Sequence, residues 1–276
     1  MSTLFQELNL LSAMTKSASN TVETNASWLE SPLGRYLLAK EQPLFNNALQ
    51  NIFGFNALQI GFNNVDLLEN CRMPHKFQIS DFAKSPNSQI TAVSHQLPIS
   101  ANSIDLVLLP HTLDFSEDPH HTLTEAERVL VGEGHVVIAG FNPISSWGLK
   151  RLISRKSHTP WNAHFLPFLR LKDWLTLLDF EITELRMTCY NLPINSENWL
   201  HRFTSKDVLK ARSWPLMGGV YFVVAKKRVP SMRLIKPSWK SPKLVQQLAS
   251  TPSQSRPSQH TSIQNTLRQL ITKSEE

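Results

Sequence analysis

The chain has little cysteine: of its 276 residues, only Cys71 and Cys189 are cysteines. Two thiols so far apart in the sequence form neither a disulfide framework nor a clustered metal site. The pair His120–His121 adds no metal site, because adjacent helix residues point in different directions and no third ligand has suitable spacing. We therefore expect reduced thiols and a fold stabilised by a hydrophobic core, which a chain of this size can bury.

Long apolar runs are also missing. The longest, such as residues 220–225, are far shorter than the ~20 residues that a membrane helix requires. The start of the chain lacks the basic segment, apolar stretch and cleavage site of a signal peptide. The sequence also has no P-loop and no G-x-S-x-G elbow. These absences predict a cytoplasmic protein with no membrane span.

Positive charge is in excess, with a formal net charge of +6 and a pI of about 9.4. Much of it lies in two runs without acidic residues, at 142–172 and 226–243. Basic runs favour anionic partners, among them RNA, ribosomes and acidic membranes. No nucleic-acid-binding motif accompanies them, so the sequence predicts only a weak contact with nucleic acid. We also expect the protein to be a monomer.

Both ends of the chain are polar. Residues 1–26 read as a flexible lead and residues 231–276 as a disordered basic and polar tail, rich in Ser, Pro and Gln. Between them, apolar strand-like runs alternate with helical patterns, which is typical of a mostly parallel sheet covered on both faces. The expected strands lie at 57–62, 76–79, 103–109, 135–141, 180–190 and 219–226, and the expected helices at 32–52, 65–70 and 122–130.

Two details refine this pattern. Thr122 and Glu125 have the spacing of a capping box, which places a helix start at Thr122. The last two strands have no clear crossover helix between them, so they predict a partly antiparallel end to the sheet.

Four stretches together resemble the class I S-adenosylmethionine-dependent methyltransferases, type 11 family. They are LPISANSIDLVLLPHTLDFSEDP at 97–119, LTEAERVLVGEGHVVIAGFNP at 123–143, FLRLKDWLTLLDFEITEL at 168–185 and GGVYFVVAKKR at 218–228. They occur in the family's order and spacing. The resemblance implies a bacterial, three-layer, Rossmann-like α/β domain over residues 27–230, with seven strands of which the last is antiparallel.

The same resemblance implies S-adenosyl-L-methionine as cofactor and an unknown acceptor, a small molecule, RNA or protein. The family's first strand ends in an acid and a glycine-rich loop. Here Gln59 stands for the acid, Gly61 matches the first glycine, and Asn63 and Val65 stand for the others. Asn tolerates the left-handed backbone that glycine supplies, whereas Val does not, so Val65 would begin the following helix.

Ligands of such sheets bind at the carboxyl ends of the parallel strands, near the switch in strand order. This rule and the resemblance select a set of residues for the cofactor: Gln59, Gly61, Asn63, Asp81, His95, Gln96 and Leu109. Asp81 would bind the ribose hydroxyls, and His95 and Gln96 the adenine. For each of them, a turn or surface role is the alternative.

His111 follows the strand expected at 103–109 and is the one candidate catalytic residue, as a base or as part of the methyl-transfer pocket, with a polar surface role as the alternative. The acidic residues after it, Asp114, Glu117 and Asp118, are expected in a solvated turn, with contact to a substrate as the alternative. Asp105, at the start of the same strand, is expected to be structural. Residues 142–172 form a long connection with aromatic and basic side chains, which would be a substrate lid or an ordinary helix with core tryptophans.

Two other functions stay open. The altered glycine loop is compatible with an inactive methyltransferase fold that serves as an interaction module, with RNA as a candidate partner. A nicotinamide-dependent oxidoreductase is disfavoured, because Gly61 does not begin a G-x-G-x-x-G sequence.

Overall fold

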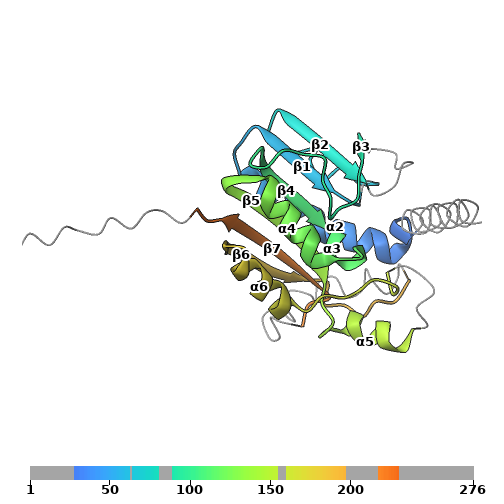
Figure 1. Cartoon of the computed structure of the whole chain (residues 1–276). Coiled ribbons are helices and arrows are strands. Elements are labelled where there is room, and N and C mark those ends of the chain that lie inside the picture. Colours follow the sequence, from blue (N-terminus) through green and yellow to red (C-terminus); the bar gives the residue numbers. More distant parts are fainter. Residues whose placement is uncertain (1–27, 63, 81–88, 155–159, 197–216, 230–276) are drawn as a thin grey trace, which may run out of the picture. The chain divides into compact units, whose positions relative to one another are not determined.

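The structure is a computed structural model that describes residues 28–62, 64–80, 89–154, 160–196 and 217–229 (Figure 1). All of them belong to one compact unit that extends to Pro230. The expected lead at 1–26 and the tail at 231–276 lie outside the described residues. No helix within the described residues is long and apolar enough to cross a membrane.

Seven strands form a single sheet in the order β3-β2-β1-β4-β5-β7-β6. The first five pair in parallel, and β7 runs antiparallel to both β5 and β6. The predicted seven-stranded sheet with an antiparallel last strand is therefore confirmed. The strands are β1 Asn56–Ile60, β2 His75–Ser80, β3 Ile90–Thr91, β4 Ile104–Pro110, β5 Leu130–Phe141, β6 Phe180–Thr188 and β7 Val220–Lys227.

Helices cover both faces of the sheet, as the continuous apolar strands require. On one face, α4 (Pro119–Val129) and α6 (Phe168–Leu177) pack on side chains such as Leu58, Ile60 and Leu109. On the other face, α2 (Pro32–Gln50) packs on Ala57, Leu106 and Leu108. The alternation of neighbouring strand residues between these two cores is the period of two expected of a strand.

Helix α2 begins where Ser31 accepts a hydrogen bond from the Gly34 N–H and Pro32 takes the first helical position. Its buried stripe contains Leu37, Glu41 and Phe45, which are spaced four residues apart. Glu41 is thus a charged residue within an apolar face, and its side chain is buried.

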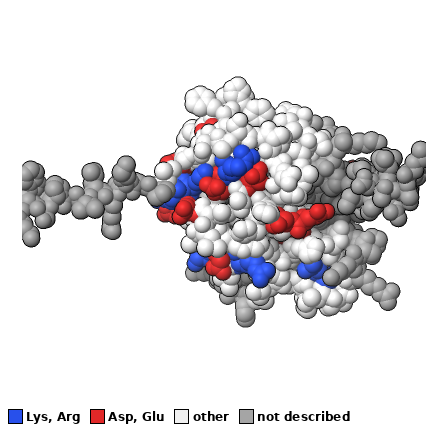
Figure 2. Space-filling model, in the orientation of Figure 1, with Lys and Arg blue, Asp and Glu red and all other residues white. Residues whose placement is uncertain are grey.

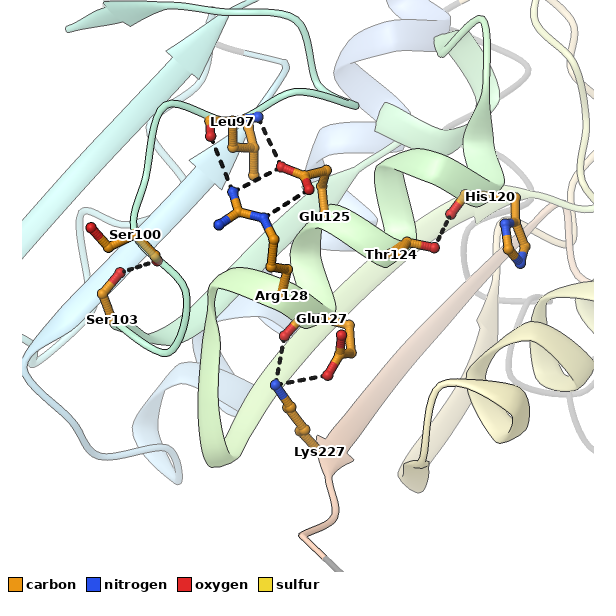
Figure 3. Close-up of polar contacts among 9 residues, drawn as sticks. All are labelled: Leu97, Ser100, Ser103, His120, Thr124, Glu125, Glu127, Arg128 and Lys227. Atoms are coloured by element: carbon orange, nitrogen blue, oxygen red, sulfur yellow. Dashed lines mark hydrogen bonds and ion pairs between the residues drawn. The ribbon is translucent and has the colours of Figure 1, made fainter.

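Two expected helix starts are wrong. Helix α4 begins at Pro119 with Asp118 as its N-cap, because Asp118 accepts the His121 N–H at 3.0 Å, so Thr122 lies inside the helix. Glu125 instead accepts the Leu97 N–H and pairs with Arg128 on the outer face of α4 (Figure 3). Residues 65–70 form turns and no α-helix.

The edge of the domain opposite the strand tips is stabilised by polar contacts between α4 and β7. Lys227 donates to the Glu127 and Leu130 carbonyl oxygens and pairs with the Glu127 carboxylate at 2.8 Å (Figure 3). Acidic and basic groups lie side by side on this face in Figure 2. Pairs at the surface contribute little each, so the buried sheet and its two cores account for most of the stability.

Two shorter helices follow strand ends: α3 (Thr112–Phe115) comes after β4 and α5 (Ser146–Ile153) after β5. Within the expected lid, Trp147, Trp161 and Phe165 are buried and pack with Phe141 and each other. These aromatics therefore belong to the core. Residues 155–159 lie outside the described residues, and a role for this connection as a lid stays a prediction.

Candidate functional site

The tips of β1 and β4 meet where the strand order reverses. β1 pairs with β2 on one side and with β4 on the other, while the chain continues from β2 and β3 to β4. In open parallel sheets this switch point leaves room for a ligand beyond the carboxyl ends of the strands. Gly61, Ser80 and His111 are at or directly after these ends.

Gly61 makes the turn that follows β1. Its φ of 74° lies in the left-handed region, and its N–H donates to the Ile79 carbonyl oxygen at 2.9 Å. A Cβ on Gly61 would lie 3.1 Å from the Thr112 hydroxyl oxygen. Both the left-handed backbone conformation and the close approach of Thr112 therefore favour glycine. Phe62 continues the turn with a φ of 56°, an uncommon value for an aromatic residue.

Gln59 braces the loop from inside the protein. Its side chain is completely buried. The amide nitrogen donates to the Val65 carbonyl oxygen at 2.9 Å, and the amide oxygen accepts the Leu67 N–H at 3.1 Å. Longer contacts join the same nitrogen to the carbonyl oxygens of Gly61 and Phe62. An amide is suited to this position because it can donate to carbonyls and accept an N–H at once.

The remaining residues predicted for the cofactor are distributed unevenly. Asn63 and Asp81 lie outside the described residues. His95 is half-buried and Gln96 is exposed. Both lie in the turn that begins at Ser94, whose hydroxyl oxygen accepts a hydrogen bond from the Thr122 hydroxyl. Leu109 is buried in the core beneath α4, so its side chain makes its contacts inside the protein.

Beyond β4, three ionisable side chains form a buried cluster, which we call the Glu41 triad: Glu41, His111 and Asp114. The His111 Nε2 atom lies 2.8 Å from Glu41 Oε1, and its Nδ1 atom lies 3.0 Å from Asp114 Oδ2. All three side chains are 0–2% exposed. The triad joins α2 to the tip of β4 and to α3.

Charge in the triad is set by the carboxylates. Burial alone would lower the pKa of His111, but Glu41 and Asp114 outweigh it and raise the pKa to about 9. His111 is therefore an imidazolium at neutral pH and donates hydrogen bonds from both ring nitrogens. Burial raises the pKa of Asp114, and His111 partly offsets this. Burial, with Asp114 nearby, also raises the pKa of Tyr221.

The triad supports the neighbouring strand ends. Asp114 Oδ2 also accepts the Phe141 N–H at 2.9 Å, at the end of β5. The His111 ring packs on Phe141, with centroids 4.1 Å apart, and on Phe62 of the Gly61 turn at 5.6 Å. Thr112 donates to the Ile60 carbonyl oxygen. One buried cluster thus holds the tips of β1, β4 and β5 in place.

This geometry differs from the expected one at two residues. Asp114 was expected in a solvated turn, and the structure corrects this: it is completely buried. His111 is buried too, in a left-handed backbone conformation with a φ of 55°. Both of its nitrogens have carboxylate partners, so the geometry favours positioning over proton abstraction. A catalytic role for His111 stays a prediction.

The structure also shows residues that the sequence analysis missed. Glu41 had one usable signal, a lone acid four residues from Leu37 and from Phe45 on an apolar helix face. Its contact with His111 spans 70 positions in the sequence, which no local pattern reveals. Asp105 was interpreted correctly as structural, since its carboxylate accepts the N–H groups of Phe55 and Asn56 at 2.9 Å.

Known proteins match this chain in sequence and in fold. The family model described as methyltransferase domain matches residues 67–138. The uncharacterised protein YafS of Escherichia coli (strain K12) is 34% identical over 237 residues, which are 84% of this chain and 93% of YafS. A structure of an S-adenosylmethionine-dependent methyltransferase from Thermotoga maritima, described as a possible histamine N-methyltransferase, is also similar. It has a TM-score of 0.50 at 15% identity, over 68% of this chain and 89% of that one.

These matches agree with the strand order and with the switch point between β1 and β4. The structural match supports the fold, the family model supports a methyltransferase domain over residues 67–138, and YafS is a relative along most of the chain. The chain therefore belongs to one family with YafS, carries a type 11 methyltransferase domain at residues 67–138, and has the fold of the S-adenosylmethionine-dependent methyltransferases.

Proposed function

We propose that this protein transfers a methyl group from S-adenosyl-L-methionine to an acceptor, and that the cofactor binds over the Gly61 turn. The observation that carries the proposal is the left-handed Gly61, which turns the chain directly after β1 at the switch point of the sheet. A glycine in this conformation lets the chain turn sharply at the strand end, which suits a backbone that a ligand approaches closely. Polar residues that follow the neighbouring strand ends in the sequence, Asn63 and Asp81, would suit a nucleoside with an amino-acid tail.

Roles for individual residues follow from their places. Asp81, directly after β2, would accept hydrogen bonds from the ribose hydroxyls, and Asn63 would extend the Gly61 turn. His95 and Gln96, which are half-buried and exposed, would face the adenine. Gln59 and Leu109 would contribute through the backbone, because their side chains are completely buried.

The bound cofactor supplies a methyl group already activated on a sulfonium. The protein therefore has to orient the acceptor in line and exclude water, and general-base chemistry is secondary. In this proposal the Glu41 triad is a positioning device. It fixes the strand tips around the turn, and His111 acts through Phe62 and Thr112 instead of touching the reacting atoms.

Calorimetric titration of the full chain with S-adenosylmethionine and S-adenosylhomocysteine tests the proposal. We expect saturable heat for both ligands, weakened at least tenfold by Asp81→Ala, a loss of about 1.4 kcal/mol or more. Asp173→Ala, an exposed acid on α6, is the control and should leave the affinity unchanged. No heat at millimolar ligand would contradict cofactor binding.

One observation favours a second candidate, an inactive methyltransferase fold that binds RNA. The Gln59 amide makes its hydrogen bonds to backbone groups of the loop, at Val65 and Leu67, and Gln59 stands where the family has an acid. A loop that serves only the fold needs no cofactor. This alternative predicts salt-sensitive RNA binding that neither S-adenosylmethionine nor Asp81→Ala changes.

A further inference from the structure

Helix α5 presents an apolar face to solvent. Leu149, Leu152 and Ile153 have the i, i+3, i+4 spacing of one helix face and are 59%, 79% and 76% exposed. The opposite side is anchored in the core by Trp147, which is completely buried and donates from Nε1 to the Asn191 carbonyl oxygen at 3.1 Å. The exposed face is thus held rigidly, and its exposure does not come from a loosely packed helix.

Neighbouring segments extend this surface. Ile144, just before α5, is 66% exposed. The segment after β6 lies against α5, since Lys150 donates to the Pro193 carbonyl oxygen, and it adds Leu192 and Ile194, which are 48% and 38% exposed. We call these six residues the α5 surface: Ile144, Leu149, Leu152, Ile153, Leu192 and Ile194.

The stretch of sequence that contains α5 carries charge of one sign. Residues 142–172 contain six Lys and Arg and no Asp or Glu. Lys150 and Arg151 lie on α5 itself, with their charged groups 5.0 Å from the ring centres of Trp161 and Phe165. These aromatics hold the long side chains beside the apolar face instead of over it. A helix with an exposed apolar face whose charged residues are all basic has the pattern of a helix that lies at an anionic lipid surface.

We propose that the α5 surface docks this protein on anionic membranes, with the apolar side chains in the interface and the basic residues on the lipid headgroups. RNA would pair with the basic residues but leave the six exposed aliphatic side chains of the α5 surface without an apolar partner. A second copy of the chain would bring two like-charged surfaces together. A lipid surface with anionic headgroups satisfies both the apolar and the charged features.

Docking would also orient the domain. Helix α5 follows β5 directly, so it begins at the same edge of the sheet as Gly61 and His111 (Figure 1). Trp147 on the buried side of α5 stacks on Phe141, with centroids 5.8 Å apart, and Phe141 packs on His111. The strand tips would therefore lie on the membrane-facing side. The docking itself does not depend on the proposed methyl transfer.

Co-sedimentation of the full chain with vesicles tests this proposal. Vesicles of phosphatidylcholine alone should bind little protein, and vesicles that also contain phosphatidylglycerol should bind it strongly at low salt and less at high salt. The double variant Leu152→Ser/Ile153→Ser should bind the anionic vesicles about tenfold more weakly or worse, because both side chains leave the interface.

The matched control is Leu169→Ser/Leu177→Ser on α6, where the two leucines are 66% and 75% exposed. It makes the same type of change on a helix that also carries Asp173, and it should bind like the unaltered chain. Equal losses in both variants, or no preference for anionic vesicles, would overturn the proposal. So would an unchanged vesicle affinity together with a loss of self-association or of RNA binding in the α5 variant.

A second measurement keeps the test decisive if the double variant folds poorly. Leu149→Cys places a thiol on the α5 surface, whereas Cys71 and Cys189 are buried. An environment-sensitive dye on this thiol should shift to the blue when anionic vesicles are added. No shift while the protein sediments with the vesicles would show that another surface binds, and would refute docking through α5.

Discussion

At the scale of single residues, Gln59 is the most informative position. From the family pattern, Gln59→Glu restores an acid and would be expected to strengthen cofactor binding. The structure predicts the opposite. The amide nitrogen donates to the Val65 carbonyl oxygen at 2.9 Å, whereas a carboxylate oxygen in its place would be buried against carbonyl oxygens, and only the other oxygen would keep a donor, the Leu67 N–H.

We therefore expect Gln59→Glu to lower the free energy of unfolding by about 2–4 kcal/mol at neutral pH and to weaken cofactor binding. Urea denaturation and calorimetric titration measure the two effects. Gln96→Glu, an exposed change of the same type, is the control for stability. A variant that is as stable as the unaltered chain and binds S-adenosylmethionine more tightly would contradict the role of the Gln59 amide in stabilising the loop.

Gly61 gives a second residue-scale prediction. Gly61→Ala adds a Cβ at a φ of 74° and 3.1 Å from the Thr112 hydroxyl oxygen. Left-handed backbone and the close contact together should reduce the free energy of unfolding by about 1–2 kcal/mol. Thermal denaturation detects this, and calorimetry should show a parallel loss of cofactor affinity. Unchanged stability and affinity would mean that the turn has room that the structure does not show.

At the scale of secondary structure, the Glu41 triad attaches helix α2 to the strand tips. Glu41→Gln keeps the shape of the side chain but removes one of the two carboxylates that pair with His111. Leaving a buried cation with a single anionic partner should lower the free energy of unfolding by about 2–4 kcal/mol. Urea denaturation measures the loss.

The control for this prediction is Glu69→Gln, an exposed glutamate whose backbone carbonyl, not its carboxylate, contacts Lys76. It should change stability by less than about 0.5 kcal/mol. Hydrogen exchange adds a local readout, because α2 should lose protection first if the triad anchors it. A Glu41→Gln protein with wild-type stability and uniform protection would show that α2 is attached by its apolar face alone.

At the scale of the whole molecule, His111 makes global stability depend on pH. Its pKa rises from 6.5 to about 9 on folding, so the proton binds more tightly to the folded state. The stabilisation is fully present below pH 6.5 and is lost as the pH rises through about 9. A shift of this size corresponds to about 3 kcal/mol. Burial of Asp114 raises its pKa and acts with the same sign at lower pH.

Urea denaturation across this pH range should therefore show stability that falls with rising pH. His135 contributes with the opposite sign, because burial, together with Lys226, lowers its pKa. Comparison with Glu41→Gln isolates the triad: with one carboxylate gone, the pKa of His111 falls and the decline with pH should be shallower. Parallel pH profiles for the two proteins would argue against a charged His111.

The sheet was predictable because its signal is local. The central strands β4, β5 and β7 contain apolar runs, at 106–109, 136–139 and 220–225, which can be found from a few neighbouring residues. Errors arose where tertiary contacts compete with local chemistry. Thr122 has the spacing of a cap, but Asp118 lies one turn earlier and accepts the helix N–H instead. Val65 closes the loop with its carbonyl oxygen on Gln59 and starts no helix.

The sequence by itself determined the strand and helix order, the left-handed turn that only Gly61 suits, and the resemblance to methyltransferases. Only the tertiary structure decided what the polar residues near that turn do. In the folded chain Asp114 is buried, the Gln59 amide hydrogen-bonds to the loop at Val65, and Glu41 contacts His111 across 70 positions of sequence. Local pattern sets secondary structure, whereas the charge and reach of a side chain depend on partners that only chain folding brings together.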